Sequence, residues 1–227
     1  KLCLKIGKEN IAAFICEPVI GAAGAAISPP DGYLQKIKKI CEDNDILFIA
    51  DEVMTGFGRT GTMLACEHWG IVPDIVTLGK GMSGGYTPIA ATVVSEKVME
   101  PIKMGSGIVM SGHTFSANPQ SAAVALSVVK YIEKNNIMKQ VENKGILLRT
   151  ELLKLQKVYP FIGDIRGKGL LLGIELVEDQ LEKTPFKREM EITNTMISLA
   201  QDVGLLLYPS QAGIDGLVGD AFIIAPP

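Results

Sequence analysis

The sequence is poor in residue types that support particular functions. Its 227 residues include four cysteines, two histidines and one tryptophan. The cysteines are widely spaced and form no Cys-x-x-Cys pair, so neither a disulfide framework nor a zinc site is indicated; they are Cys3, Cys16, Cys41 and Cys66. Glu67 and His68 follow Cys66, but no second cluster of ligands accompanies them. We therefore expect no bound metal and a reducing, cytoplasmic environment.

Neither sign of charge dominates, because 22 basic residues face 25 acidic ones and the net charge is −3. Such a balance gives no support to binding of nucleic acid or another polyanion. No apolar run reaches the roughly 18 residues that a membrane-spanning helix needs, and no secretory pattern opens the chain. We expect neither a nucleic-acid partner nor a membrane partner.

What the sequence does contain is the composition of an ordinary globular protein. Hydrophobic residues make up 47% of the chain and charged residues 21%. A chain of this length buries a proper core, as one large domain or one plus a small one. It begins at Lys1 without a methionine and ends at Ala225-Pro226-Pro227, directly after a strand-like run. We therefore expect it to be a piece of a longer polypeptide.

The first half alternates apolar runs with amphipathic segments. Residues 11–16 form a continuous apolar run, typical of a parallel strand buried on both faces. Residues 31–44 carry apolar side chains at helical spacing, and residues 46–50 form the next apolar run. This strand–helix–strand order predicts a βαβ unit. Similar patterns predict a short helix over 64–69, strands over 74–78 and 89–94, and helices over 120–134 and 137–157.

The pattern changes in the last third of the chain. There we expect a turn over 165–169, a strand over 170–176, a helix over 187–203 that Gly204 ends, and short strands over 205–207 and 222–224. The fold class is thus α/β, with a mostly parallel sheet followed by a smaller α+β part. We place the boundary so that residues 1–140 belong to the large domain and residues 141–227 to the small one.

An acid and an amine stand where two of the predicted strands end. Asp51 lies at the carboxyl end of its strand, the position where α/β sheets hold ligands. A helix N-cap or a turn acid is the other interpretation of Asp51. Lys80 follows the next strand between Gly79 and Gly81, in an otherwise uncharged loop. Loss of solvation there would favour its nucleophilic amine form, whereas the alternative is an ordinary surface lysine.

Together the two residues match a division of labour in pyridoxal enzymes. In these enzymes a lysine forms a Schiff base with the cofactor, and an acid pairs with the pyridinium nitrogen. A nucleotide-binding module is the competing α/β interpretation. That module needs Gly-x-Gly-x-x-Gly after a strand, and the glycines from Gly79 to Gly85 do not have this spacing.

Longer motifs around these residues resemble the class III (omega) aminotransferases. They are Asp51-Glu-Val-Met-Thr-Gly-Phe-Gly-Arg-Thr-Gly61, Pro73-Asp74, Gly79-Lys80-Gly81, Gly112-His-Thr-Phe-Ser-Ala-Asn-Pro119 and Arg166-Gly-Lys-Gly169. Their order and spacing fit the family over essentially the whole chain. The resemblance implies a fold-type I transferase whose cofactor is pyridoxal 5′-phosphate.

The resemblance also implies roles for individual residues. Lys80 corresponds to the aldimine lysine and Asp51 to the partner of the ring nitrogen, while Val53 should pack against one face of the ring. Thr114 resembles the threonine that binds the cofactor phosphate across a dimer interface, which implies a homodimer. Glu17 resembles an active-site acid on the substrate side, and a strand-end acid that stabilises a loop is its other interpretation. His113 is expected to be structural.

Three departures from the family pattern are visible. Met54 stands where several members have a glutamine that reaches the ring hydroxyl. Ile223 stands where many members have an arginine for a substrate carboxylate. The phosphate-binding glycine/serine loop and the ring-stacking aromatic of the family correspond to positions upstream of Lys1.

The activity implied by the resemblance is transamination from an amine or omega-amino acid to a 2-keto acid through a Schiff base on Lys80. Three alternatives stay open: an aminomutase of the glutamate-semialdehyde type, a pyridoxal-dependent decarboxylase, and a non-catalytic fragment of such an enzyme. The loss of the arginine at Ile223 turns the expectation slightly away from members that use 2-oxoglutarate.

Overall fold

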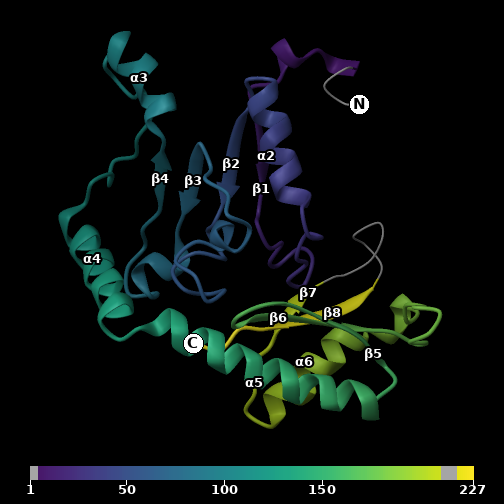
Figure 1. Ribbon diagram of the computed structural model, residues 1–227. Helices are drawn as coiled ribbons and strands as arrows, with labels where there is room; N and C mark the ends of the chain where they lie inside the picture. Colours follow the sequence, from purple (N-terminus) through teal and green to yellow (C-terminus); the bar gives the residue numbers. More distant parts are fainter. Residues whose placement is uncertain (1–4, 211–218) are drawn as a thin grey trace. The chain divides into compact units, whose positions relative to one another are not determined.

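The computed structural model describes residues 5–210 and 219–227, so Cys3 lies outside the described part. The chain forms two compact units (Figure 1). The first comprises Lys1–Pro18, Pro29–Gly58 and Thr62–Ile137, and the second Val19–Ser28, Arg59–Gly61 and Met138–Pro227. Among the described residues each unit contains one four-stranded sheet.

The sheet of the first unit is mostly parallel. Its order is β1-β2-β3-β4, where the strands are β1 (Ala13–Cys16), β2 (Leu47–Asp51), β3 (Ile75–Leu78) and β4 (Ala91–Val94). β1 pairs with β2 and β2 with β3 in parallel, whereas β4 runs antiparallel to β3. Helix α2 (Tyr33–Asp43) connects β1 to β2. The predicted βαβ unit is therefore confirmed.

Burial alternates along the strands of this sheet. On β2, Phe48 and Ala50 are fully buried, and on β3 the same face carries Val76. Alternate side chains of a strand point to opposite faces, so the other face carries the partly exposed residues of β2, including Asp51. β1 is an edge strand among the described residues, and Ile15 is 59% exposed. The prediction of burial on both faces was wrong for this strand.

Shorter elements complete the first unit. They are η1 (Lys8–Asn10), η2 (Ala65–Trp69), η3 (Lys80–Ser83), α3 (Glu96–Met104) and α4 (Pro119–Lys134). The Asn118 side chain caps α4 by accepting from the Ser121 N–H at 3.0 Å. Ala125 of α4 packs into one cluster with Val76, Leu78 and Met82. No element was predicted where α3 lies, because Pro101 interrupts its apolar pattern.

The second unit has an antiparallel sheet with the order β5-β6-β8-β7. Its elements are α5 (Ile137–Val158), β5 (Ile162–Lys168), β6 (Leu171–Leu176), η4 (Arg188–Met190), α6 (Ile192–Asp202), β7 (Tyr208–Ser210) and β8 (Asp220–Ile224). The core of this unit joins the strands to both helices, through Ile162, Ile165, Ile174, Leu176 and Phe222 with Leu152 and Met196 packed against them.

Two segments of this unit differ from the prediction. Residues 165–168 are strand rather than turn, because β5 continues to Lys168; the turn lies at Gly169 and Leu170. Residues 205–207 are not a strand, because the Leu205 N–H bonds back to the Ala200 carbonyl at 2.8 Å and closes α6. α6 itself begins at Ile192 rather than at 187, and Gly204 follows it with φ +83°, as predicted for a C′ glycine.

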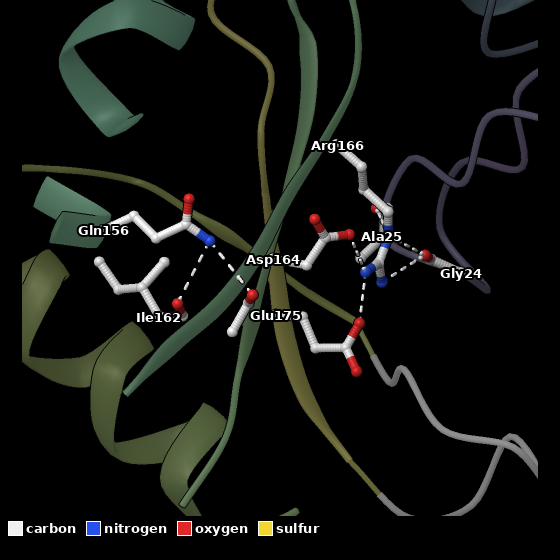
Figure 2. Close-up of polar contacts among 8 residues, drawn as sticks. Gly24, Ala25, Gln156, Ile162, Asp164, Arg166 and Glu175 are labelled. Atoms are coloured by element: carbon white, nitrogen blue, oxygen red, sulfur yellow. Dashed lines mark hydrogen bonds and ion pairs between the residues drawn. The ribbon is translucent and has the colours of Figure 1, made fainter. Parts of the chain in front are cut away.

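The loop of residues 19–28 packs tightly on the second sheet (Figure 2). The Arg166 guanidinium donates to the carbonyls of Gly24 and Ala25, and also pairs with Asp164 at 3.1 Å and with Glu175. A Cβ on Gly173 would lie 1.8 Å from the Ala25 carbonyl oxygen. The glycine-rich loop, which in sequence only separates a strand from a helix, is thus built into the core of the second unit. Gln156 similarly ties α5 to β5 through the carbonyl of Gly163 at 3.1 Å.

Candidate functional site

Three strand ends meet at one edge of the first sheet. Because β1, β2 and β3 are parallel neighbours, their carboxyl ends lie side by side. Glu17 directly follows β1, Asp51 is the last residue of β2, and Lys80 comes two residues after β3. The structure therefore brings together the strand ends that carry three of the residues predicted from the sequence.

Asp51 presents a half-buried carboxylate at this edge. Its Oδ1 accepts a hydrogen bond from the backbone N–H of Val53 at 3.1 Å. Within residues 5–210 and 219–227, no donor is bonded to its Oδ2. Asp51 lies in register with Thr77 of β3, so their side chains share one face of the sheet. One oxygen thus fixes the carboxylate, and the other remains able to accept a hydrogen bond.

Lys80 opens the 3₁₀ turn η3 with a left-handed backbone, φ +41°. A non-glycine residue in this region is strained by about 1 kcal/mol or more. The turn holds because Met82 is buried in the core and the buried Ser83 donates to the Thr87 carbonyl at 2.6 Å. The Lys80 side chain is exposed and pairs with no acid in the described part of the chain. The described residues leave this side of the turn open and do not themselves desolvate Lys80, so the loss of solvation stays a prediction.

Val53 lies beside the turn that carries Lys80. Its Cγ1 is 3.5 Å from the position that a Cβ on Gly79 would occupy, which is ordinary van der Waals contact. Val53 thus connects the two segments: its N–H bonds to Asp51, and its side chain lies against Gly79, which precedes Lys80.

Glu17 and Thr114 have different surroundings. Glu17 is half-buried next to the end of β1. Thr114 is exposed in a loop before α4 and forms no hydrogen bond to Asp51 or Lys80 among the described residues. The main chain of His113 is bonded to Ser116 in both directions, through Ser116 Oγ at 2.8 Å and the Ser116 N–H at 2.9 Å.

Glu52 is a buried acid that the sequence analysis did not single out. It is 0% exposed, and its carboxylate accepts hydrogen bonds from the Thr55 hydroxyl, from Ala65 N at 3.0 Å and from Cys66 N at 2.8 Å. The Asp-Glu pair at the strand end was visible in the sequence. Two of the three donors lie 13 and 14 residues further on, however, and no local pattern announces them.

The nearby thiols are poor nucleophiles. Burial, together with the neighbouring Glu52, raises the pKa of Cys66 far above its usual value. Burial and the nearby Cys41 raise the pKa of Cys16 to about 11. Because the thiolate is the reactive form, neither cysteine competes with Lys80 as a nucleophile at neutral pH.

Two departures from the family pattern can be placed in the structure. Met54 is half-buried two positions after Glu52 and has no hydrogen-bond donor for a ring hydroxyl. Ile223 is 2% exposed on β8, in register with Gly173 and Tyr208. An apolar side chain therefore occupies the position where an arginine would hold a carboxylate.

Other kinds of site find no support in the described residues. They contain no group of three or more histidine, cysteine or acidic side chains that is able to hold a metal ion. Of the helices that the structure describes, none combines the length and the hydropathy that crossing a bilayer requires.

Comparison with known proteins decides the family. The profile described as "Aminotransferase class-III" matches residues 1–215. The chain belongs to the class-III aminotransferases. Over 223 residues it is 56% identical to an uncharacterized aminotransferase, YodT, of Bacillus subtilis (strain 168), and the match covers 98% of this chain and 50% of that protein. This aminotransferase chain thus spans about half the length of the curated relatives that it matches.

Solved structures agree on the fold. A transaminase from the marine bacterium Virgibacillus shares 36% identity with a TM-score of 0.94, over 100% of this chain and 51% of that one. An amine transaminase from an uncultivated Pseudomonas species, described as the PLP-bound (internal aldimine) form, shares 35% identity with a TM-score of 0.91, over 100% and 50%. The class-III aminotransferase chain therefore has the fold-type I architecture, with a mostly parallel and an antiparallel sheet.

Proposed function

We propose that this chain forms part of a pyridoxal-phosphate-dependent aminotransferase, which moves an amino group from an amine or omega-amino acid to a 2-keto acid. The observation that carries the proposal is the edge of the first sheet. There Asp51 ends β2, and Lys80, which pairs with no acid among the described residues, follows the neighbouring strand β3. Family membership and the PLP-bound Pseudomonas relative support it.

The residues at this edge fit pyridoxal phosphate. Asp51 Oδ2 is available to accept a hydrogen bond from the N–H of a pyridinium ring, while Oδ1 already accepts from the Val53 N–H. The Lys80 amine is not committed to an ion pair in the described part of the chain, so it is free to bind an aldehyde as a Schiff base. Val53 offers an apolar surface beside the same turn for one face of a ring.

When bound, the cofactor supplies an electron sink for the carbanion that forms as the substrate loses a proton. The residues of this chain provide the rest. Lys80 would hold the cofactor through its Nζ, and the same amine is placed to accept and return a proton as general base and acid. Asp51 would hold the ring nitrogen in its protonated form. Glu17, at the adjoining strand end, is proposed to face the substrate.

A second copy of the chain is proposed to complete the site through Thr114. The loop around Thr114 exposes several large apolar side chains, and Met110 and Phe115 are 90% and 81% exposed. Such a concentration of exposed apolar groups marks an interaction surface. In a two-fold dimer this surface would bury itself, and Thr114 would reach the cofactor phosphate of the partner. A second chain would also remove water from the exposed Lys80.

Two broader expectations remain proposals. We propose that residues 1–140 belong to the cofactor-binding domain and residues 141–227 to a small domain. We also propose a cytoplasmic location for the enzyme. With the apolar, buried Ile223 at this position, we propose that the contact to a substrate carboxylate is absent or supplied by another residue, which slightly favours an acceptor other than 2-oxoglutarate.

The decisive experiment replaces Lys80 in the complete polypeptide that carries these residues. Lys80→Ala removes the amine that links the cofactor, so the visible absorbance band of the linked cofactor and the transaminase activity should both be lost. Lys130→Ala, which alters an exposed lysine of α4, is the matched control and should retain both. A Lys80→Ala enzyme that kept the band and its turnover would refute the assignment.

A spectrum of the wild-type protein and a nitrogen-transfer assay separate the alternative functions. A wild-type protein that forms no absorbance band with pyridoxal phosphate would be the non-catalytic fragment. An aminomutase would move the amino group within one substrate molecule, whereas an aminotransferase moves isotopically labelled nitrogen from a donor to a separate keto acid. A panel of amine donors, each tested with pyruvate and with 2-oxoglutarate, would then identify the substrates.

A further inference from the structure

Glu52 stands between two residues that the proposed function assigns to the cofactor, Asp51 and Val53. Both neighbours are half-buried, whereas the Glu52 side chain is completely buried. β2 ends at Asp51, and the chain enters a turn at Val53. Because Glu52 is bonded covalently to both residues, anchoring Glu52 restricts where Asp51 and Val53 can lie.

The main chain of Glu52 is fixed at both ends of the residue. Its N–H donates to the Thr77 carbonyl of β3 at 3.0 Å, and its carbonyl accepts from the Gly56 N–H at 2.9 Å. A Cβ on Gly56 would lie 2.9 Å from that same carbonyl oxygen, so the chain turns closely over Glu52. The bond to Thr77 joins the end of β2 to β3, which Lys80 follows, and the bond from Gly56 closes the turn after β2.

The side chain of Glu52 connects this point to a distant segment. Three donors converge on one carboxylate: the hydroxyl of the fully buried Thr55 and the first N–H groups of η2, from Ala65 and Cys66. All three partners are donors, which an ionised carboxylate satisfies because it only accepts. A glutamine would place an amide NH₂ against at least one of these donors.

Resting on the proposed function, we infer that Glu52 is a positioning residue of the cofactor site. Its buried carboxylate pins the segment after β2 to η2, and thereby holds Asp51 against the ring nitrogen and Val53 against the ring face. Glu52 itself touches neither cofactor nor substrate. The same arrangement explains how an acid is buried beside a strand end with no basic partner among the residues that the structure describes, since backbone and hydroxyl donors satisfy it.

The test compares Glu52→Gln with Glu67→Gln, because Glu67 also accepts a hydrogen bond at the start of the 3₁₀ turn η2. Glu67 Oε1 accepts from the Leu64 N–H at 2.7 Å and caps η2 from the exposed side. The full polypeptide with Glu52→Gln or Glu67→Gln is titrated with pyridoxal phosphate, and the pH midpoint of the bound-cofactor absorbance is recorded. Urea unfolding of each variant is measured in parallel.

We expect Glu52→Gln to weaken cofactor binding about tenfold or more and to shift the pH midpoint, because Asp51 no longer meets the ring nitrogen correctly. Glu67→Gln should change neither. If Glu52→Gln lowered only the urea midpoint, with wild-type affinity and pH midpoint, Glu52 would be purely structural and the inference would be overturned. If the wild-type protein formed no band at all, the proposed function would fail first.

Thr55→Val decides the question if Glu52→Gln does not fold. Valine has nearly the same shape as threonine, and this change removes one donor to Glu52 while leaving the carboxylate and both η2 bonds in place. Cofactor binding should then weaken about threefold, in line with one lost hydrogen bond. Unchanged affinity and an unchanged pH midpoint in Thr55→Val would overturn the inference.

Discussion

At the residue scale, the two carboxylate oxygens of Asp51 differ in their hydrogen bonding. Oδ1 accepts from the Val53 N–H at 3.1 Å, whereas Oδ2 has no donor among the described residues. A fixed carboxylate next to a ring nitrogen favours the protonated ring by its charge as well as by its hydrogen bond. The charge of the Asp51 side chain, rather than its shape, is therefore the property to test.

Asp51→Asn keeps the shape and removes the charge. Because Asn still accepts the Val53 bond, we expect cofactor binding to remain largely intact, while turnover falls about 10²- to 10³-fold, the range for loss of one electrostatic contact. Single-turnover kinetics with a saturating amine donor would measure the fall. Asp31→Asn, at an exposed acid of the same unit, should behave as wild type. A near-normal rate in Asp51→Asn would disprove the electron-sink role.

The sequence predicts where these residues lie along the strands, but not their backbone conformation or burial. Asp51 and Lys80 follow apolar runs, so their strand-end positions could be predicted from pattern alone. The left-handed backbone of Lys80 could not, because it depends on the burial of Met82 and Ser83 after it. The burial of Glu52 could not either, because its donors Ala65 and Cys66 lie far along the chain.

At the element scale, one carboxylate joins α2, β2 and β3. Asp74 Oδ2 accepts from the Phe48 N–H of β2 at 2.8 Å and from Lys38 Nζ of α2 at 3.0 Å. Both side chains of the ion pair are largely buried. Burial alone would raise the pKa of Asp74, but the bonds from Phe48 and Lys38 outweigh it and leave this pKa below its usual value. The connection that Asp74 makes between α2, β2 and β3 therefore depends on the ionised form of Asp74.

Asp74→Asn should destabilise the protein by about 1.5 to 3 kcal/mol at pH 7, the range for hydrogen bonds to a charged group. Because the folded pKa is depressed, the stability that Asp74 provides is fully present above its unfolded pKa of about 4 and is lost as the pH falls through the folded value. Urea unfolding at pH 7 and near pH 3.5 should therefore show a smaller difference between variant and wild type at the lower pH. An equal difference at both would contradict this account.

Glycines explain one of the errors at this scale. The density of glycine around Arg166 favours a turn, yet β5 runs through it to Lys168. Gly167 has φ +115°, and a Cβ there would lie 2.0 Å from the Leu171 carbonyl oxygen, so this glycine permits close strand pairing. Sequence patterns do not distinguish a glycine that turns the chain from one that lets two backbones approach.

At the scale of the whole molecule, the βα alternation predicted the order of elements in the first unit, and its motifs predicted the family. The membership of residues 19–28 in the second unit could not be predicted, since it depends on Arg166 and Gly173 more than 130 residues away. Long-range contacts of this kind have no local signature. The exposed loop around Thr114 raises the same point for assembly, because a contact with a second copy of the chain has no local signature either.

Hybrid dimers test whether Thr114 acts in its own subunit or in the partner. Lys80→Ala and Thr114→Ala chains, each of low activity alone, are mixed, and the hybrid is isolated with two different affinity tags. If Thr114 serves the partner, the Thr114→Ala chain supplies Lys80 and the Lys80→Ala chain supplies Thr114, so each hybrid regains about one intact site. The hybrid should then show roughly half of the wild-type activity and absorbance band. If Thr114 serves its own subunit, both sites stay defective, and a hybrid no more active than its parents would disprove the shared site.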